Sequence, residues 1–181
     1  MRWIWVDRIL EIEKGERCVA IKNVSSGEDV LYDHFPATER RPRVPVLPHS
    51  LVIEGMAQTA GVLVGYTGDF KEKVVLAKIG KAIFHRTVRP GFAIRFTATL
   101  ERFDVSGAAT RGHVDWIDPA TGDTERMAEI TLMFSHIDRN RSNLQFPEHN
   151  FVFTGQLMEM IQVSGVTDAR VYDAPQNPVT L

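Results

Sequence analysis

The sequence predicts an α+β fold in which an antiparallel sheet curls around one buried helix. Two stretches, residues 93–103 and 125–137, alternate apolar and polar side chains, which is typical of strands with one buried face. A third stretch, residues 50–64, is apolar on every side of a helical wheel, so it has no polar face to turn toward water. Short turns between successive strands favour antiparallel pairing, and the buried helix then lies inside the curl of the sheet.

The first expected elements are a strand and the central helix. Residues 17–23 form a short strand after the turn-forming pair Lys14-Gly15. The helix begins after Pro48, with Ser50 as the residue that caps its first backbone N–H groups. It ends at Gly65, a residue type that commonly stops helices.

The later elements form a meander of strands. In 93–103 the apolar side chains share one face, namely Ile94, Phe96, Ala98 and Leu100. The pair Ser106-Gly107 turns the chain into a strand that includes 113–117, and the turn at 118–123 leads into the strand at 125–137. Trp3 and Trp5 alternate as on a strand, where both are expected to serve packing.

Length and composition indicate one soluble domain with an appendage. The chain has 181 residues, of which 44% are hydrophobic and 24% charged, with a formal net charge of −2. This balance gives no general attraction to nucleic acid or to an anionic membrane. No apolar run is long enough to span a bilayer, so no membrane association is expected.

The single cysteine, Cys18, cannot form an internal disulfide or a zinc site that needs two thiolates. Its neighbours Val19 and Ala20 indicate a small, buried strand residue. The N-terminal residues reach Asp7 and Arg8 too early for a secretory signal. The expected location is therefore the cytoplasm.

Two residues carry candidate chemistry. Glu54 is a carboxylate on an otherwise apolar helix, where burial suits either a general acid or a structural group held by a polar partner. His34 lies in the loop that leads into this helix and is either a general base or a solvent-facing or structural histidine. Gln58 lies one helical turn after Glu54 and either orients that carboxylate or completes a buried polar network.

These residues belong to a recognisable pattern. The segment HFP…PVLPHSLVIEGMAQ, residues 34–58, resembles the signature H-F-P-G-x-P-x-x-P-G-x-L-x-x-E-A-M-A-Q of the 3-hydroxyacyl-acyl-carrier-protein dehydratases of fatty-acid synthesis. The segment AIFHRTVRPG, residues 82–91, is similar to the family segment A-x-F-x-R-x-V-x-P-G. Residues 6–8 and 21–24 look like its N-terminal strands, so the resemblance covers about residues 3–137.

The resemblance implies a hotdog fold, in which an antiparallel sheet wraps a long central helix. It also implies a homodimer, with a trimer of dimers as a further possibility, whose shared sites pair His34 of one subunit with Glu54 of the other. His34 then removes the C2 proton of a (3R)-3-hydroxyacyl thioester, and Glu54 assists departure of the 3-hydroxyl to give a trans-2-enoyl thioester. The substrate would be linked to acyl carrier protein or coenzyme A, without a metal or redox cofactor. The residues expected to bind it are Phe35, His49, Ser50 and Gln58.

The sequence departs from the family pattern near this site. Ala37 and His49 stand where the pattern has glycine, and residues 37–44 contain an insertion of about six residues. The insertion carries Arg40, Arg41 and Arg43, which either receive an acidic carrier or simply face solvent. A hotdog thioesterase and a non-catalytic subunit that binds acyl thioesters therefore remain as alternative functions.

The resemblance divides the chain into a hotdog domain at 1–137 and an extension at 138–181. The extension contains an apolar island at 151–153 and a short expected helix at 154–161, and its end, from Gly165, looks like a tail. The apolar residues of this extension either cover the sheet or a dimer edge, or plug the tunnel that holds the acyl chain.

Overall fold

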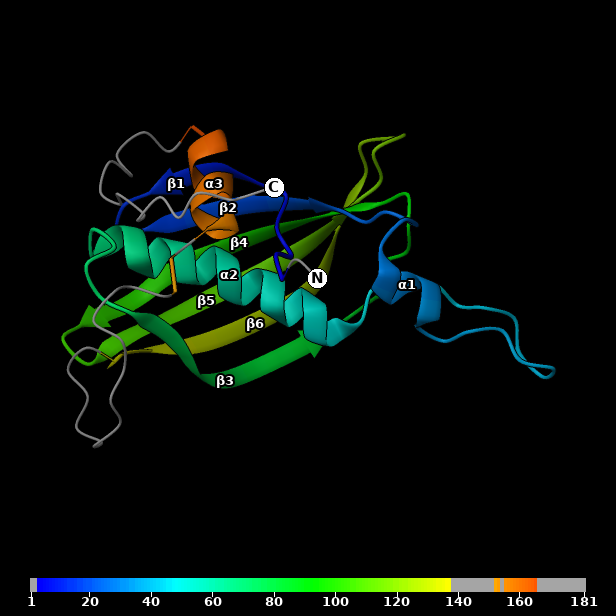
Figure 1. Cartoon of the computed structure of the whole chain (residues 1–181), viewed down its shortest axis with the longest axis horizontal. Helices are drawn as coiled ribbons and strands as arrows, with labels where there is room; N and C mark the ends of the chain where they lie inside the picture. Colours follow the sequence, from blue (N-terminus) through cyan, green and yellow to red (C-terminus); the bar gives the residue numbers. More distant parts are fainter. Residues whose placement is uncertain (1–2, 138–151, 154, 166–181) are drawn as a thin grey trace, which may run out of the picture.

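We describe the protein from a computed structural model, which describes residues 3–137, 152–153 and 155–165. Six strands and a long helix make up most of the molecule (Figure 1). In chain order the elements are β1 (Arg8–Glu13), β2 (Arg17–Asn23), α1 (Asp29–Asp33), α2 (His49–Thr67), β3 (Val74–Phe84), β4 (Ala93–Asp104), β5 (Gly107–Ile117), β6 (Thr124–His136) and α3 (Gln156–Val163).

The six strands form one antiparallel sheet, and α2 lies across one face of it (Figure 1). The strand order is β1-β2-β4-β5-β6-β3, so β1 and β3 are the two edges. Helix α2 contacts all six strands, as a helix enclosed by a curled sheet must. The expected α+β hotdog architecture is confirmed.

Helix α2 is longer than the sequence indicated. It begins at His49, with Pro48 as its N-cap, and no side chain caps it, so the prediction that Ser50 is the cap is wrong. It continues past Gly65 to Thr67 because Gly65 serves close packing instead of ending the helix. A Cβ atom at Gly65 would lie 2.4 Å from the ring of Phe153.

The core lies between α2 and the concave face of the sheet. Two glycines allow close approach there: a Cβ at Gly55 would lie 2.5 Å from the Phe96 ring, and one at Gly112 would lie 2.4 Å from the sulfur of Met56. Phe96 and Met56, which pack against these glycines, are fully buried. The alternation in β4 and β6 therefore identified two of the strands that pack on α2.

Two elements did not stand out in the sequence. Strand β3 mixes apolar residues with lysines and glycine, and most of it is exposed on both faces. Trp3 and Trp5, expected on a strand, precede β1 instead; Trp5 is buried, and Trp3 is exposed.

The described part of the extension packs on the domain. Phe153, Met158 and Ile161 are buried, and α3 lies beside β1, where the Ser164 hydroxyl accepts a hydrogen bond of 2.9 Å from the Ile9 backbone N–H. The helix expected at 154–161 is found two residues later. The tail expected after Gly165 and residue 151 of the apolar island lie outside the described residues. No helix within the described ranges is long and apolar enough to cross a membrane.

Candidate active site

His34 follows the short helix α1 and is half-buried. Its Nδ1 lies 2.7 Å from the backbone carbonyl oxygen of Val46. Because a carbonyl oxygen only accepts hydrogen bonds, Nδ1 must carry the proton of the neutral ring. The lone pair of that ring is then on Nε2, which is the nitrogen able to take a proton from a substrate.

The segment that orients His34 is itself anchored. Val46 is buried, and the backbone N–H of the following residue, Leu47, donates to the carbonyl of Val88 at 3.0 Å. Val88 is completely buried. The inserted residues 37–44 therefore join a fixed stretch of chain before α2 begins.

Glu54 lies on α2 with Gln58 one turn later. The Gln58 Nε2 donates to Oε1 of Glu54 at 2.9 Å and to the Trp3 carbonyl at 2.9 Å. The backbone N–H of Trp5 donates to Oε1 of Gln58 at 2.8 Å, which fixes the orientation of the amide. Gln58 thus orients the carboxylate and ties it to the N-terminal segment.

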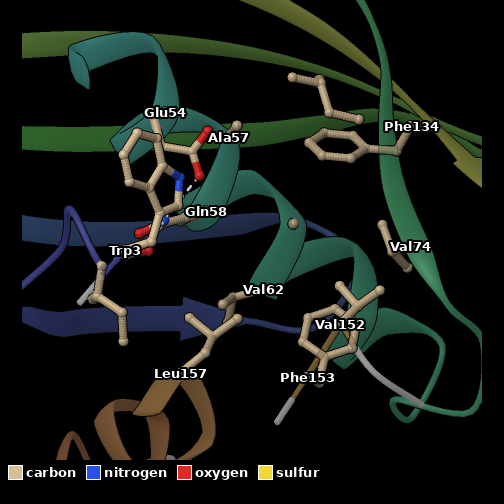
Figure 2. Close-up of a pocket in the computed structure, with 13 residues that line it drawn as sticks. Trp3, Glu54, Ala57, Gln58, Val62, Val74, Phe134, Val152, Phe153 and Leu157 are labelled. Atoms are coloured by element: carbon tan, nitrogen blue, oxygen red, sulfur yellow. Dashed lines mark hydrogen bonds between the residues drawn. The ribbon is translucent and has the colours of Figure 1, made fainter. Parts of the chain in front are cut away.

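Glu54 opens into a cavity of about 470 Å³ beside α2 (Figure 2). Glu54, Gln58 and Trp3 lie at one end of this cavity, and apolar side chains form the rest of it. The apolar part comes from α2, from the neighbouring strands and from the extension: Ala57, Gly61, Val62, Val74, Leu76, Phe134, Val152, Phe153 and Leu157. A polar head and an apolar body suit a substrate with a reactive group on a hydrocarbon chain.

His34 lines a different cavity, of about 980 Å³, together with Ser50 at the start of α2. Trp3 and Ile4 line both cavities and lie between them. The single chain therefore brings Glu54 together with Gln58, and His34 together with Ser50, but it places the proposed base and acid in separate cavities.

Phe35 and His49, which are also expected to bind the substrate, make different contacts. Phe35 is exposed, with its ring centroid 4.1 Å from that of His34, and it has a positive φ of 53°. His49 lines neither of these two cavities; its ring stacks on Phe84 at 3.9 Å, with an interplanar angle of 2°. Burial lowers the pKa of His49, although a hydrogen bond to the Arg86 backbone opposes that shift.

The arginines of the insertion are partly engaged within their own loop. Arg43 donates to the Leu31 carbonyl at 2.8 Å and lies over the Tyr32 ring, and Arg41 lies over the ring of Phe35. Among the residues that the structure describes, no three His, Cys, Asp or Glu side chains cluster as they would to hold a metal ion.

Residues 3–129 match the model of the FabA-like domain, which covers β1 to β5, the first part of β6, α2 and both candidate residues. The chain belongs to the FabA-like family. The match ends before α3, so the extension lies outside the matched part of the chain.

Two of the curated relatives carry the same name. A 3-hydroxyacyl-[acyl-carrier-protein] dehydratase FabZ of Caldanaerobacter subterraneus is 43% identical over 111 residues, which cover 61% of this chain and 74% of the relative. The protein of that name from Symbiobacterium thermophilum is 36% identical over 137 residues, or 75% of this chain and 88% of the relative.

Solved structures share the fold of this family member. The dehydratase heterocomplex ApeI:P of Xenorhabdus doucetiae gives a TM-score of 0.56 at 15% identity, covering 74% of this chain and 83% of that one. A thioesterase superfamily member of Thermus thermophilus gives 0.51 at 15% identity, covering 69% and 83%. Dehydratases and thioesterases thus share this architecture, and only the site residues distinguish the two activities.

Sequence reasoning singled out Glu54 and Gln58 at the polar end of the smaller cavity but missed part of its apolar wall. Val74 and Leu76 lie on β3, which was not recognised as a strand because its alternation is weak. The role of Trp3 between the two cavities was also missed, since packing was the expected role of both tryptophans.

Proposed function

We propose that the protein is a hydro-lyase that converts (3R)-3-hydroxyacyl thioesters to trans-2-enoyl thioesters in fatty-acid synthesis or a related lipid or polyketide route. The observation that carries this proposal is the fixed tautomer of His34, which presents Nε2 as a base, in a chain that belongs to the FabA-like family. The names of the curated relatives support the same reaction and suggest acyl carrier protein as the carrier of the substrate.

His34 and Glu54 divide the work of the elimination. Nε2 of His34 takes the C2 proton, and the electrons of the C2–H bond form the C2=C3 double bond. The C3–O bond breaks, and the departing hydroxide receives the proton of Glu54 and leaves as water. Proton transfers by such positioned groups typically contribute about 10²–10⁴-fold each.

The base and acid of one reaction come from two subunits of a homodimer in this proposal. Within one chain they line separate cavities, so the site is incomplete without a second copy. Strand β3 supports this arrangement because it is an unpaired sheet edge with exposed Leu76, Ile79 and Ile83, directly beside the cavity of Glu54. An apolar edge of this kind is suited to pairing with its own copy.

The start of α2 supplies electrostatic stabilisation. The first backbone N–H groups of a helix have no carbonyl partner within the helix, and Ser50 in this first turn lies in the cavity of His34. A thioester carbonyl placed there develops negative charge as the C2 proton leaves, and free N–H groups stabilise that charge.

Turnover assays with purified protein test the reaction. The protein is incubated with a 3-hydroxyacyl thioester, and formation of the conjugated enoyl thioester is followed by its ultraviolet absorbance. His34→Ala and Glu54→Gln should each lower the rate by at least about a hundredfold. Wild-type rates in both variants contradict the mechanism, release of free thiol indicates a thioesterase, and absence of both reactions indicates a binding subunit.

Mixed dimers test the shared site. After subunit exchange between the two inactive variants, one site per heterodimer contains intact His34 and Glu54, and activity should return. Exchange is verified by mass spectrometry of differently tagged subunits. Failure of verified heterodimers to recover activity contradicts a site formed from two chains.

The expected location in the cytoplasm is part of the same proposal. It is supported by the single cysteine, which is buried and unpaired, as is usual in a reducing compartment.

A further inference from the structure

The cavity of Glu54 ends against the extension, which lies outside the family match. Its polar end lies at Glu54 and Gln58, and its far end is formed by Val152, Phe153 and Leu157 of the extension (Figure 2). The family match stops at residue 129, so these three residues lie outside the matched part of the chain.

Phe153 is fixed in this position from two sides. Its side chain is almost completely buried, and its ring packs on the Cα of Gly65 so closely that an added Cβ would lie 2.4 to 2.9 Å from three ring atoms. Its ring also meets that of Phe70 edge to face, with centroids 5.0 Å apart. The absence of a side chain at Gly65 therefore leaves the space on α2 in which the Phe153 ring packs.

We infer that Phe153, supported by Leu157, closes the acyl pocket and sets the longest acyl chain that the enzyme accepts. This inference rests on the proposed function, since the occupant of the groove is the hydrocarbon chain of the thioester. The walls between Glu54 and Phe153 are apolar, so such a chain replaces no polar contact as it enters.

The rise per residue of α2 gives the approximate length of the pocket. Gly65 lies eleven positions after Glu54 in α2, which is about 16 Å along the axis. Van der Waals contact with the Phe153 ring removes about 3.5 to 4 Å of this length. An extended alkyl chain advances about 1.3 Å per carbon, so about nine carbons fit beyond the reacting C3. A 3-hydroxyoctanoyl chain fits within this length, and a 3-hydroxyhexadecanoyl chain exceeds it.

Gly61 offers a matched test of the groove without the extension. It lies between the two ends of the cavity, and a Cβ there would have ordinary contact with Phe134 at 3.8 Å. The variant Gly61→Leu should fold and fill the middle of the groove, which lowers kcat/KM for 3-hydroxyoctanoyl relative to 3-hydroxybutanoyl thioester.

The deciding experiment compares kcat/KM for 3-hydroxyoctanoyl and 3-hydroxyhexadecanoyl thioesters. Wild type should favour the octanoyl substrate, and Phe153→Ala should lower that preference by about tenfold or more, because the far end opens. Phe153→Leu, a milder change in case the alanine variant folds poorly, should shift the preference less in the same direction. Ile161→Val, in the same segment but outside the groove, should keep the wild-type preference.

The outcomes separate the inference from the function on which it rests. A shift with Gly61→Leu but none with either Phe153 variant overturns the inference and leaves the groove as the acyl site. A wild-type preference for the hexadecanoyl substrate also overturns it. If no thioester is dehydrated, the proposed function fails. The Tm of the protein is then measured with saturated acyl-pantetheines of increasing length, to find the longest chain that still stabilises it. The same longest chain in wild type and in Phe153→Ala overturns the inference.

Discussion

His34 is oriented by a backbone carbonyl and not by a carboxylate. The Val46 carbonyl fixes the tautomer, and the segment that carries it is anchored to the buried Val88 through Leu47. A carbonyl, unlike a carboxylate, holds the ring without placing a full negative charge beside it.

His49 and His113 should make the stability of the protein depend on pH. Burial is the main cause that lowers the pKa of both below the ordinary value near 6.5, and for His113 the nearby Arg126 adds to this. The unfolded chain therefore binds more protons below about pH 6.5, so stability is retained above that pH and falls as the pH decreases through the lowered pKa values.

Thermal melts between about pH 7.5 and about pH 5 measure this effect. His49→Gln should reduce the fall in Tm on acidification, while the exposed His85→Gln should keep the wild-type slope. A steeper fall in His49→Gln than in the wild type would count against the assignment.

Cys18 should be inert while the protein is folded. Burial raises the pKa of its thiol to about 12, so at pH 8 only about one thiol in 10⁴ is ionised. Iodoacetamide should label the native protein far more slowly than the protein in denaturant, as measured by intact mass. Equal labelling rates in the two states would contradict the burial of this residue.

At the scale of the element, α2 forms part of the core, carries Glu54 and Gln58, and packs closely on Phe153. Its sequence revealed only part of this. The apolar wheel identified a buried helix, and Glu54 and Gln58 stood out because polar residues are rare in it. The ends of the helix were less predictable, since Gly65 is a common helix stop whose packing role depends on Phe153, a residue far away in the sequence.

The strands were predictable to the extent that one face packs on α2. Alternation identified β4 and β6, which match the expected ranges to within about one residue at each end. Alternation did not identify β3, because this edge strand buries little of either face within one chain. The cavity wall formed by β3 was therefore missed as well.

Gly55 and Gly61 of α2 face different surroundings, so their alanine variants form a matched pair. In Gly55→Ala the new Cβ would lie 2.5 Å from the Phe96 ring and 3.0 Å from the Trp5 carbonyl oxygen, so stability should fall by about 1–3 kcal/mol. In Gly61→Ala the Cβ has room, and the better helix propensity should raise stability by up to about 1 kcal/mol. Chemical denaturation measures both, and a stabilised Gly55→Ala would contradict the packing described.

At the scale of the whole molecule, the two edge strands of the sheet have different surroundings. Edge β1 has α3 beside it, whereas edge β3 exposes apolar side chains along its length. This difference assigns the dimer contact to β3 in the proposed arrangement.

A charge on the β3 edge should therefore separate the subunits. Ile79→Lys places an ammonium group on the exposed edge, and the protein should become monomeric and lose dehydratase activity, because each site needs two chains. Val105→Lys, at an exposed turn between β4 and β5, is the matched control and should stay dimeric. Light scattering after gel filtration gives the masses, and an active monomeric Ile79→Lys would contradict the proposal.

The hydrogen bond from Ile9 to Ser164 joins positions that are 155 residues apart, so this contact at one edge of the sheet forms only after residue 164 has been synthesised. At about 5–20 residues per second, a ribosome needs about 8 to 30 s to cover that distance. During this interval β1 presents an open row of backbone groups to neighbouring nascent chains. The extension thus protects the β1 edge against aggregation only after residue 164 has been synthesised, and a chain cut after residue 137 would never receive that protection.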